Sequence, residues 1–318
     1  MRYALLAALT FATVAAAQPY PARPIRVIVA YPAGGQYDLV ARVVAQKWGE
    51  AEPQPMIVEN RAGANGIVGT EHVAKAAADG YTLLLGGSGP NGINQALYPK
   101  LPYDTLRDFK PIVAASSQPN LLVAHPSLNV ASLTELVSAA RAKPGEIAYA
   151  SNGAGSSNHL CMELLANGLA IRLNHVPFKG ASPAVAATLG GQTALHFGTP
   201  ADLVPQIKAG KLRVLATSGA RRAAILPDAP TIAESGIPGY GCFSWLGYLA
   251  PAGTADEVIA KLNSVINRIL EMPDVRERIA PGGSGEIIGG APEVYANLIR
   301  SEIAKWTKVV REAGVKVD

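Results

Sequence analysis

The segment Ile25–Asp38, IRVIVAYPAGGQYD, decides the fold because it joins a buried strand to a glycine-rich turn and a helix. Its first six residues are apolar except Arg26, a pattern typical of a strand inside a sheet. The turn Pro32–Asp38 follows, and apolar residues then recur at helical spacing. A helix start has unpaired backbone N–H groups and the positive end of the helix dipole. Because glycines let an anion approach this backbone, the segment predicts an anion site.

A second segment, Ile147–Leu160, repeats this arrangement about a third of the chain later. Its sequence, IAYASNGAGSSNHL, again runs from an apolar strand through a glycine-rich turn into a helix. Either turn alone is an ordinary tight connection in an α/β fold. Together, the two turns predict two halves of a molecule that hold one small anion between them.

Strands and helices alternate along most of the chain, which predicts an α/β fold built on mainly parallel, doubly wound sheets. Two such sheets are expected, because ten strand candidates accompany the two similar turns. The strand candidates are Ile25–Ala30, Met56–Glu59, Thr82–Leu85, Ile112–Ala115, Leu121–Ala124, Ile147–Ala150, Asn174–Phe178, Ala194–Phe197, Leu212–Ala216 and Trp245–Ala250.

The predicted break between the two sheets is Ser117–Asn120, and the chain is expected to return near Tyr240–Trp245. The first domain would then comprise residues 18–120 plus 243–318, and the second domain residues 121–242. The C-terminal helices are expected to pack on the first domain. In the last of them, Trp306 belongs to an apolar stripe and is interpreted as a packing residue.

Residues 1–17 have the features of a secretory signal peptide. A basic start, Met1-Arg2, precedes the apolar run Tyr3–Val14, and small residues lead to cleavage after Ala17. The apolar run is too short to span a bilayer, and no cysteine near the cleavage site could carry a lipid anchor. We therefore expect an exported protein without a membrane anchor.

The composition is that of a globular protein, with 49% hydrophobic and 16% charged residues. The formal net charge of +4 becomes +3 when Arg2 is removed with residues 1–17. This small surplus forms no basic stripe, so we expect no nucleic-acid partner. Cys161 and Cys242 are the two cysteines, and an oxidising compartment would permit a disulfide between them. The sequence leaves two free thiols as an equal alternative, because it does not give the Cα separation.

Three motifs of other protein classes are incomplete. Gly87–Gly92 reads G-x-G-x-x-G but lacks the acidic residue that a dinucleotide site requires, so Ser88 and its neighbours are interpreted as a third wall of the anion site. No phosphate-binding lysine motif is present. A secreted hydrolase using Ser156 or Ser88 is the alternative, but no G-x-S-x-G elbow occurs, and His159 is interpreted as a cap or packing group. We expect no metal and no cofactor, because no histidine, cysteine or carboxylate cluster has ligand spacing.

Longer stretches closely resemble one family. They are PARPIRVIVAYPAGGQYDLVAR (21–42), SNGAGSSNHL (151–160), HVPFKGASPA (175–184) and LPDAPTIAESGIPGY (226–240). This combination resembles the Bug-type receptors, the extracytoplasmic solute-binding proteins of tripartite tricarboxylate transporters.

The resemblance implies a two-domain periplasmic binding protein of the Venus flytrap type, with two crossing strands as hinge. It implies a periplasmic receptor, not an enzyme, that binds a mono-, di- or tricarboxylic acid, aromatic acids included, or a related amide. Backbone N–H groups and ordered waters would make the contacts, and the membrane components of a tripartite transporter would be the partner. Ligand-dependent signalling to a membrane sensor is an alternative use of the same site. A monomer is expected.

The implied ligand contacts come from both domains. Those in the first domain are Ala33, Gly34, Gly35, Tyr37 and Asp38. Ser88 is added from the third glycine-rich turn and not from the resemblance. Those in the second domain are Ser151, Gly153, Ala154, Gly155, Ser156, Lys179, Thr199 and Asp202.

Three of these side chains have a plain alternative role. Asp38 is expected to bond to loop N–H groups or to a water, since a carboxylate beside a bound anion is repulsive. Lys179 would supply a positive charge or lie in solvent, and Tyr37 would stack on a flat ligand or only line the site. The turns Ala62–Asn65 and Gly198–Ala201 depart from the family's usual wording, which leaves the ligand's identity open.

Overall fold

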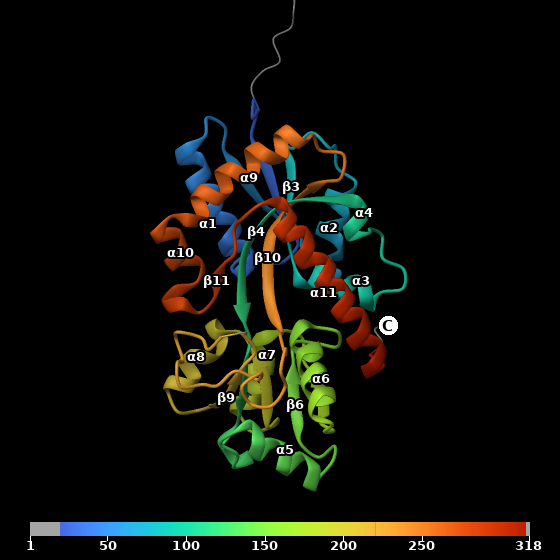
Figure 1. Cartoon of the computed structure of the whole chain (residues 1–318), viewed down its shortest axis with the longest axis vertical. Coiled ribbons are helices and arrows are strands. Elements are labelled where there is room, and N and C mark those ends of the chain that lie inside the picture. Colours follow the sequence, from blue (N-terminus) through green and yellow to red (C-terminus); the bar gives the residue numbers. More distant parts are fainter. Residues whose placement is uncertain (1–19, 220, 316–318) are drawn as a thin grey trace, which may run out of the picture.

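The computed structural model describes residues 20–219 and 221–315, which form two α/β domains joined by long strands (Figure 1). The predicted signal peptide, residues 1–17, lies outside the described residues. Each domain contains one sheet with helices on its faces, as the sequence predicts.

The first sheet has six strands and the second has five. In spatial order, the first contains β11 (Glu286–Ile287), β4 (Phe109–Pro119), β10 (Phe243–Pro251), β3 (Thr82–Gly87), β1 (Ile25–Val29) and β2 (Met56–Asn60). The second contains β7 (Asn174–Pro177), β6 (Ala148–Ser151), β8 (Leu195–Gly198), β5 (Leu121–Ala124) and β9 (Arg213–Thr217). All ten strand candidates overlap a strand, and within residues 20–219 and 221–315 the two-residue β11 is the one strand that the sequence did not predict.

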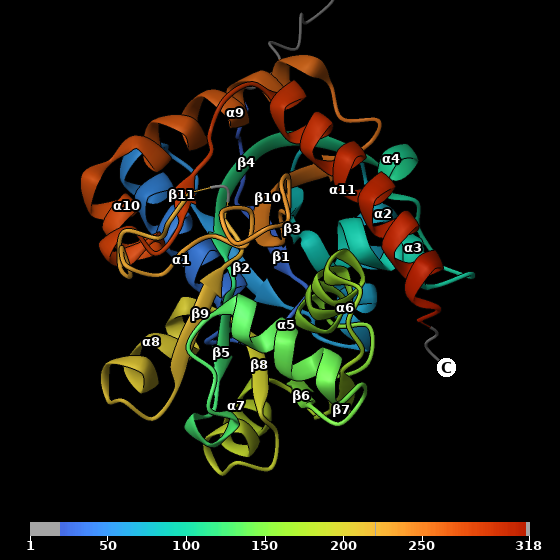
Figure 2. The ribbon, with the colours of Figure 1, turned by 60° about the horizontal axis from the view of Figure 1, so that its bottom comes forward.

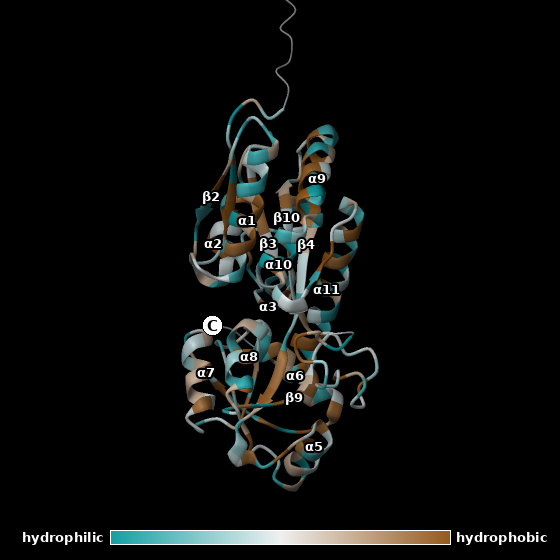
Figure 3. Cartoon of the chain, turned by 90° about the vertical axis from the view of Figure 1, so that its left-hand side faces the viewer, coloured by the Kyte–Doolittle hydropathy of each residue, from teal (hydrophilic) through white to brown (hydrophobic). Residues whose placement is uncertain are grey.

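The helices follow the same division. Those formed from the residues before β4 and after β10 are α1 (Gln36–Ala51), α2 (Ile67–Ala74), α3 (Asn94–Leu97), α4 (Thr105–Asp108), α9 (Asp256–Glu271), α10 (Pro273–Ile279) and α11 (Pro292–Ala313). Those between β5 and β9 are α5 (Leu133–Ala142), α6 (Ser157–Leu169), α7 (Ala181–Leu189) and α8 (Pro200–Lys208). Figure 3 shows mostly apolar strands inside each domain and helices that carry both hydrophilic and apolar residues.

Most strands of each sheet point one way, β1 to β4 in the first and β6 to β9 in the second, but both sheets are mixed. In the first sheet, β1 pairs in parallel with β2 and β3, whereas β10 is antiparallel to both β3 and β4. In the second sheet, β5 is antiparallel to β8 and β9. The strands that break the pattern connect the two domains, so no crossover helix returns them in parallel.

The chain passes between the domains through β4 and β10. The pairing of these two strands extends from Phe109↔Pro251 to Pro119↔Phe243, where the second domain begins. After β4 the chain continues directly into β5 at Leu121. The boundaries at residues 120 and 243 themselves stay a prediction.

Helix α11 contacts both domains, and not the first domain alone as expected from the sequence. Its Trp306 and Val309 are buried in the same apolar cluster as Leu160 and Leu165 of α6. The two helices lie side by side in both views (Figure 1, Figure 2). Trp306 is therefore a packing residue, as predicted, but the core that it fills includes residues of the second domain.

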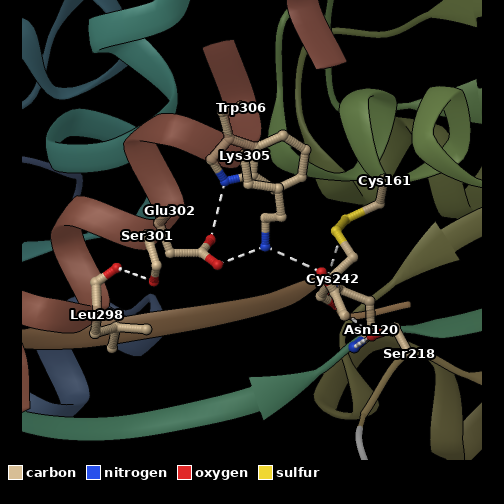
Figure 4. A network of polar contacts seen from close by, with 10 residues as sticks. Asn120, Cys161, Ser218, Cys242, Leu298, Ser301, Glu302, Lys305 and Trp306 are labelled. Carbon is tan, nitrogen blue, oxygen red and sulfur yellow. Dashed lines mark hydrogen bonds and ion pairs between the residues drawn. A yellow bond between two sulfur atoms is a disulfide. The ribbon is translucent and has the colours of Figure 1, made fainter. Parts of the chain in front are cut away.

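A buried carboxylate ties α11 to the returning strand (Figure 4). Glu302 is 4% exposed, and it accepts hydrogen bonds from Lys305 Nζ at 2.5 Å and from Trp306 Nε1 at 3.0 Å. Lys305 also donates to the Gly241 carbonyl at 3.0 Å. The buried charge is thus fully paired, which a carboxylate in this position requires.

Cys161 and Cys242 form a disulfide, which answers the question that the sequence leaves open. Their Cα atoms lie 5.7 Å apart, within the usual range. The bond joins α6 to the residue that precedes β10. Beside it, Ser218 Oγ and Asn120 Nδ2 both donate to the Cys242 carbonyl (Figure 4). The two chain segments that connect the domains, at Asn120 and at Cys242, are therefore bonded to each other and to α6 at one place.

Reduction of this disulfide should destabilise the folded protein by about 2–4 kcal/mol, because the bond closes a loop between residues 81 positions apart. The measurement is urea unfolding of residues 18–318 with and without dithiothreitol. The double variant Cys161→Ala/Cys242→Ala is the control, and reductant should leave its free energy of unfolding unchanged. Equal stability of the oxidised and reduced wild type would contradict the prediction.

Candidate functional site

The directions of the strands place the first glycine-rich turn at the edge of its sheet that faces the second domain. Strand β4 is antiparallel to β10, and β10 is antiparallel to β3, so β4 points the same way as β3 and β1. The carboxyl end of β4 is where the chain leaves for the second domain. The carboxyl ends of β1 and β3 therefore lie at that same edge.

The second sheet presents the carboxyl ends of three strands to the first domain. Leu121, at the amino end of β5, pairs with Gly198, at the carboxyl end of β8. Strand β6 is parallel to both β7 and β8, so all three end at this edge. The loops after β6, β7 and β8 thus face those after β1 and β3, and ligands of open α/β sheets bind at such edges.

The first loop exposes Ala33, Gly34 and Gly35 before α1 begins at Gln36. Gly34 has a positive φ of 87°, a conformation that favours glycine. The N-cap residue Gly35 offers no side-chain acceptor, so the first N–H groups of α1 keep their capacity to bind an anion.

Asp38 is buried beneath this loop and fully engaged by the protein. Its carboxylate accepts hydrogen bonds from Gly34 N at 3.0 Å, Arg42 Nε at 2.9 Å and Asn60 Nδ2 at 3.0 Å. The hydrogen bond from Arg42 is the main reason that the pKa of Asp38 is lowered to about 2. The expected bond between Asp38 and a loop N–H is confirmed.

The second loop has a similar construction before α6 begins at Ser157. Gly153 and Gly155 have φ values of 133° and 73°, and Ala154 between them is exposed. The N-cap residue Ser156 makes no side-chain capping bond to the helix, and its hydroxyl lies 2.6 Å from the Gly153 carbonyl. The start of α6 is therefore also without a side-chain cap.

The third turn contains Ser88, which is 4% exposed, followed by a short π-helical segment, Gly89–Ile93. Gly87 has no room for a side chain, since a Cβ there would lie 2.4 Å from the Tyr37 hydroxyl. The Tyr37 ring packs on Tyr31, with 4.6 Å between the ring centroids. Burial raises the pKa of Tyr37 well above its usual range. The structure thus accounts for Tyr37 within the first domain, and its contact with a ligand stays a prediction.

Lys179, Thr199 and Asp202 follow β7 and β8 and lie at the facing edge. Lys179 is exposed. Thr199 is half-buried at the N-cap of α8, and its hydroxyl donates to Asp202 Oδ2 at 2.7 Å. The fourteen expected residues therefore lie in or beside the loops after β1, β3, β6, β7 and β8 at the facing edges. Tyr37 and Asp38 are already in α1, Asp202 is in α8, and Ser151 is the last residue of β6. Their ligand contacts stay predictions.

The hydrolase alternative receives no support at Ser156. Its neighbour His159 is buried and stacked on His175, which confirms the predicted packing role, and its Nδ1 accepts from Gly155 N in the loop at 3.0 Å. A serine–histidine contact does exist elsewhere, between Ser151 Oγ and His175 Nε2 at 2.6 Å. Sequence reasoning missed it because the two residues are brought together only by the pairing of β6 with β7.

Asn60 and Arg42 are further residues that the sequence analysis did not identify. Arg42 could have been found from its spacing, because residues four apart on a helix are neighbours. Asn60 gave no signal, since it reaches Asp38 from the end of β2. Among the helices of residues 20–219 and 221–315, none combines the length and apolar character needed to cross a bilayer.

Comparisons with known proteins agree with this geometry. Residues 40–315 match the family model described as Tripartite tricarboxylate transporter family receptor. Protein BugT of Bordetella pertussis is 40% identical over 302 residues, covering 95% of this chain and 92% of the relative. Two solved structures from Rhodopseudomonas palustris, each 34% identical, are also similar. The structure of Rpa4515 with adipate has a TM-score of 0.82, and the match covers 93% of this chain and 99% of that chain. The structure of MatC with bound malate has a TM-score of 0.78, and the match covers 92% of this chain and 100% of that chain.

The fold and the facing loops are those of a two-domain periplasmic binding protein of the Venus flytrap type. Within this class, the chain belongs to the tripartite tricarboxylate transporter receptor family and is a Bug-type solute-binding receptor.

The substitution Asp38→Asn should lower the free energy of unfolding at pH 7 by about 1–2 kcal/mol, because it removes the charge from the bond to Arg42. Since the folded-state pKa is about 2, below the ordinary 3.8, this stabilisation is complete above pH 4 and is lost as the pH falls through about 2. Urea unfolding at several pH values measures the difference. The exposed carboxylate variant Asp228→Asn is the control, and a difference between wild type and Asp38→Asn that grows on acidification would refute the prediction.

Proposed function

We propose that the protein binds a small organic acid by its carboxylate between the loops Ala33–Gly35 and Ser151–Ser156 and delivers it to the membrane components of a tripartite tricarboxylate transporter. The observation that carries the proposal is that two helices begin, without side-chain caps, at the facing edges of the two sheets. Such helix starts favour an anion. The similar structures with adipate and with malate support an acid of this size.

Backbone groups can supply the required affinity. A dissociation constant near 1 μM corresponds to about 8 kcal/mol of binding free energy. Hydrogen bonds to a charged group contribute about 1.5–3 kcal/mol each, so a handful from the two loops suffices after the costs of association. Asp38 does not oppose the ligand strongly, because Arg42 neutralises its charge.

Binding is coupled to closure of the two domains, residues 18–120 plus 243–318 against residues 121–242. The carboxylate binds first to one open half, and closure brings the second helix start against it. The ligand drives closure because it binds the closed state more tightly. Strands β4 and β10 act as the hinge, and no catalytic step is needed.

The protein acts as a monomer in the periplasm after residues 1–17 are removed by cleavage following Ala17. The Cys161–Cys242 disulfide supports this location, since such bonds persist in oxidising compartments.

A carboxylate placed on either loop should compete with the ligand. We expect Ala33→Asp and Ala154→Asp each to weaken binding about tenfold or more, which is at least about 1.4 kcal/mol. Both alanines are exposed, neither needs a positive φ, and an acidic residue near a helix start does not destabilise the helix. Isothermal titration with the best acid from a thermal-shift panel that includes adipate and malate measures the effect.

The matched controls are Ala33→Asn and Ala154→Asn, which have the same size without the charge and should stay within about threefold of wild type. Equal binding by the Asp and Asn variants would place the ligand elsewhere. If no mono-, di- or tricarboxylic acid stabilises the wild type, the proposed function fails.

A further inference from the structure

Each of the three glycine-rich turns is held by the same hydrogen bond. In each, a glycine N–H donates to the side chain four residues later, on the helical segment that follows. The three pairs are Gly34–Asp38, Gly87–Asn91 and Gly155–His159, each at 3.0 Å. Because these bonds fix the backbone of each turn, they decide where the remaining N–H groups of the loop point.

Within the described part of the chain, the same bond occurs twice more, between Asp104 and Asp108 and between Ala131 and Glu135. This hydrogen bond, from a backbone N–H to the side chain four residues later, therefore recurs in this protein where a turn leads into a helical segment. In four of the five cases the acceptor is a carboxylate or an amide. The exception is the second ligand loop, where a histidine accepts the bond through a ring nitrogen that a second proton would occupy.

His159 belongs to a stacked pair of imidazole rings beneath the second loop. Its ring lies parallel to that of His175, with 3.7 Å between the centroids and 5° between the planes. His175 Nε2 lies 2.6 Å from Ser151 Oγ, and this hydroxyl also contacts the Gly153 carbonyl at 3.1 Å. The pair therefore holds the loop at two points, Ser151 and Gly155.

We propose that His159 is the positioning residue of the second ligand loop. Its Nδ1 holds the Gly155 N–H, and His175, stacked against it, holds Ser151, so that the uncapped start of α6 is presented to the ligand. This role rests on the proposed function, because it assigns to the histidine pair the shape of one half of the carboxylate site.

The hydrogen bond from the Gly155 N–H to His159 Nδ1, called the brace below, exists only while the His159 ring is neutral. A neutral imidazole has one protonated and one unprotonated ring nitrogen. Because Nδ1 accepts the hydrogen bond from Gly155 N, Nδ1 is unprotonated and the proton is on Nε2. Nε2 lies 3.9 Å from Oε1 of Glu163, which itself accepts from the Tyr149 hydroxyl at 2.5 Å. A second proton would occupy Nδ1 and leave Gly155 N–H without an acceptor.

The groups around the ring oppose this second proton on balance. The charged or titratable groups that face it are Glu163 from α6, Tyr149 from β6 and His175 from β7. Glu163 favours the charged ring. Burial, and to a smaller extent the electrostatic effect of His175, nevertheless lower the pKa of His159 to about 4. The brace is therefore complete above the usual histidine pKa of 6.5 and is lost as the pH falls through about 4.

The first loop should not respond over this range, because Asp38 remains an acceptor down to a pH of about 2. As the pH falls, the Gly155–His159 hydrogen bond is therefore lost before the Gly34–Asp38 hydrogen bond. This difference gives a readout that needs no ligand: the protection of the Gly155 and Gly34 amides against hydrogen exchange, measured by NMR on residues 18–318 from pH 7.5 to about 3, between the two pKa values. We expect protection of Gly155 to fall about tenfold relative to Gly34. Parallel behaviour of the two amides would overturn the proposal.

Two variants separate the acceptor from the titration. His159→Asn keeps an acceptor near the position of Nδ1 but cannot be protonated, so it should retain protection of Gly155 and remove the pH response. His159→Leu fills space without an acceptor, so protection should be lost at every pH. His125→Asn, a histidine at the opposite end of β5, is the control and should behave as wild type. Unchanged Gly155 protection in His159→Leu would refute the brace.

Adipate binding, with malate as the second probe, distinguishes this proposal from the proposed function. At pH 7.5, His159→Leu should weaken binding about tenfold, and His159→Asn should stay within about twofold of wild type. If wild type and His159→Leu bind equally although Gly155 protection is lost, His159 does not position the site and the receptor function stands. If the wild type binds no acid of the panel, the receptor function fails, while the amide measurements still decide the brace.

Discussion

The antiparallel pairing of β4 with β10 is the constraint on which the rest of the structure depends. The two strands carry the chain out of the first domain and back, and their register extends from Phe109 to Pro119 along β4. Because β3 pairs with β10, this pairing fixes the direction of β1 and β3. It therefore decides that the first glycine-rich turn faces the second domain. A crossover helix in place of β10 would have produced a parallel sheet without this return.

The proposed site uses little side-chain charge. The positive potential comes from backbone N–H groups at two helix starts, and the nearest buried charges are compensated within the protein. Asp38 is paired with Arg42, and the stacked histidines are neutral at pH 7. Under the proposed function, acids of different length could bind, because recognition would depend on one carboxylate and on the shape of the loops. This agrees with similar receptors whose structures contain adipate and malate.

Three contacts concentrate at the passage between the domains and limit how they can move. The disulfide joins α6 to the beginning of β10, Lys305 of α11 bonds to Gly241, and Trp306 fills the core beside α6. All three lie on one flank of the hinge strands (Figure 4). Motion of the second domain that keeps these contacts would leave this flank fixed and change the distance between the loops at the facing edges. Such hinge motion about a packed contact needs few backbone changes.

The sequence by itself determined the local elements and the family. The strand at Ile25–Val29, the turn at Gly34, the helix start at Gln36 and their repeat around Ser151–Ser157 follow from periodicity and glycine placement, which act within a few residues. Only the tertiary structure decided the mixed direction of the strands, the Cys161–Cys242 bond, the contact of α11 with both domains, and the meeting of Asp38 with Asn60 and of His159 with His175. The physical reason is that these pairs are far apart in sequence. No local pattern carries their distance, and packing and strand pairing alone bring them together.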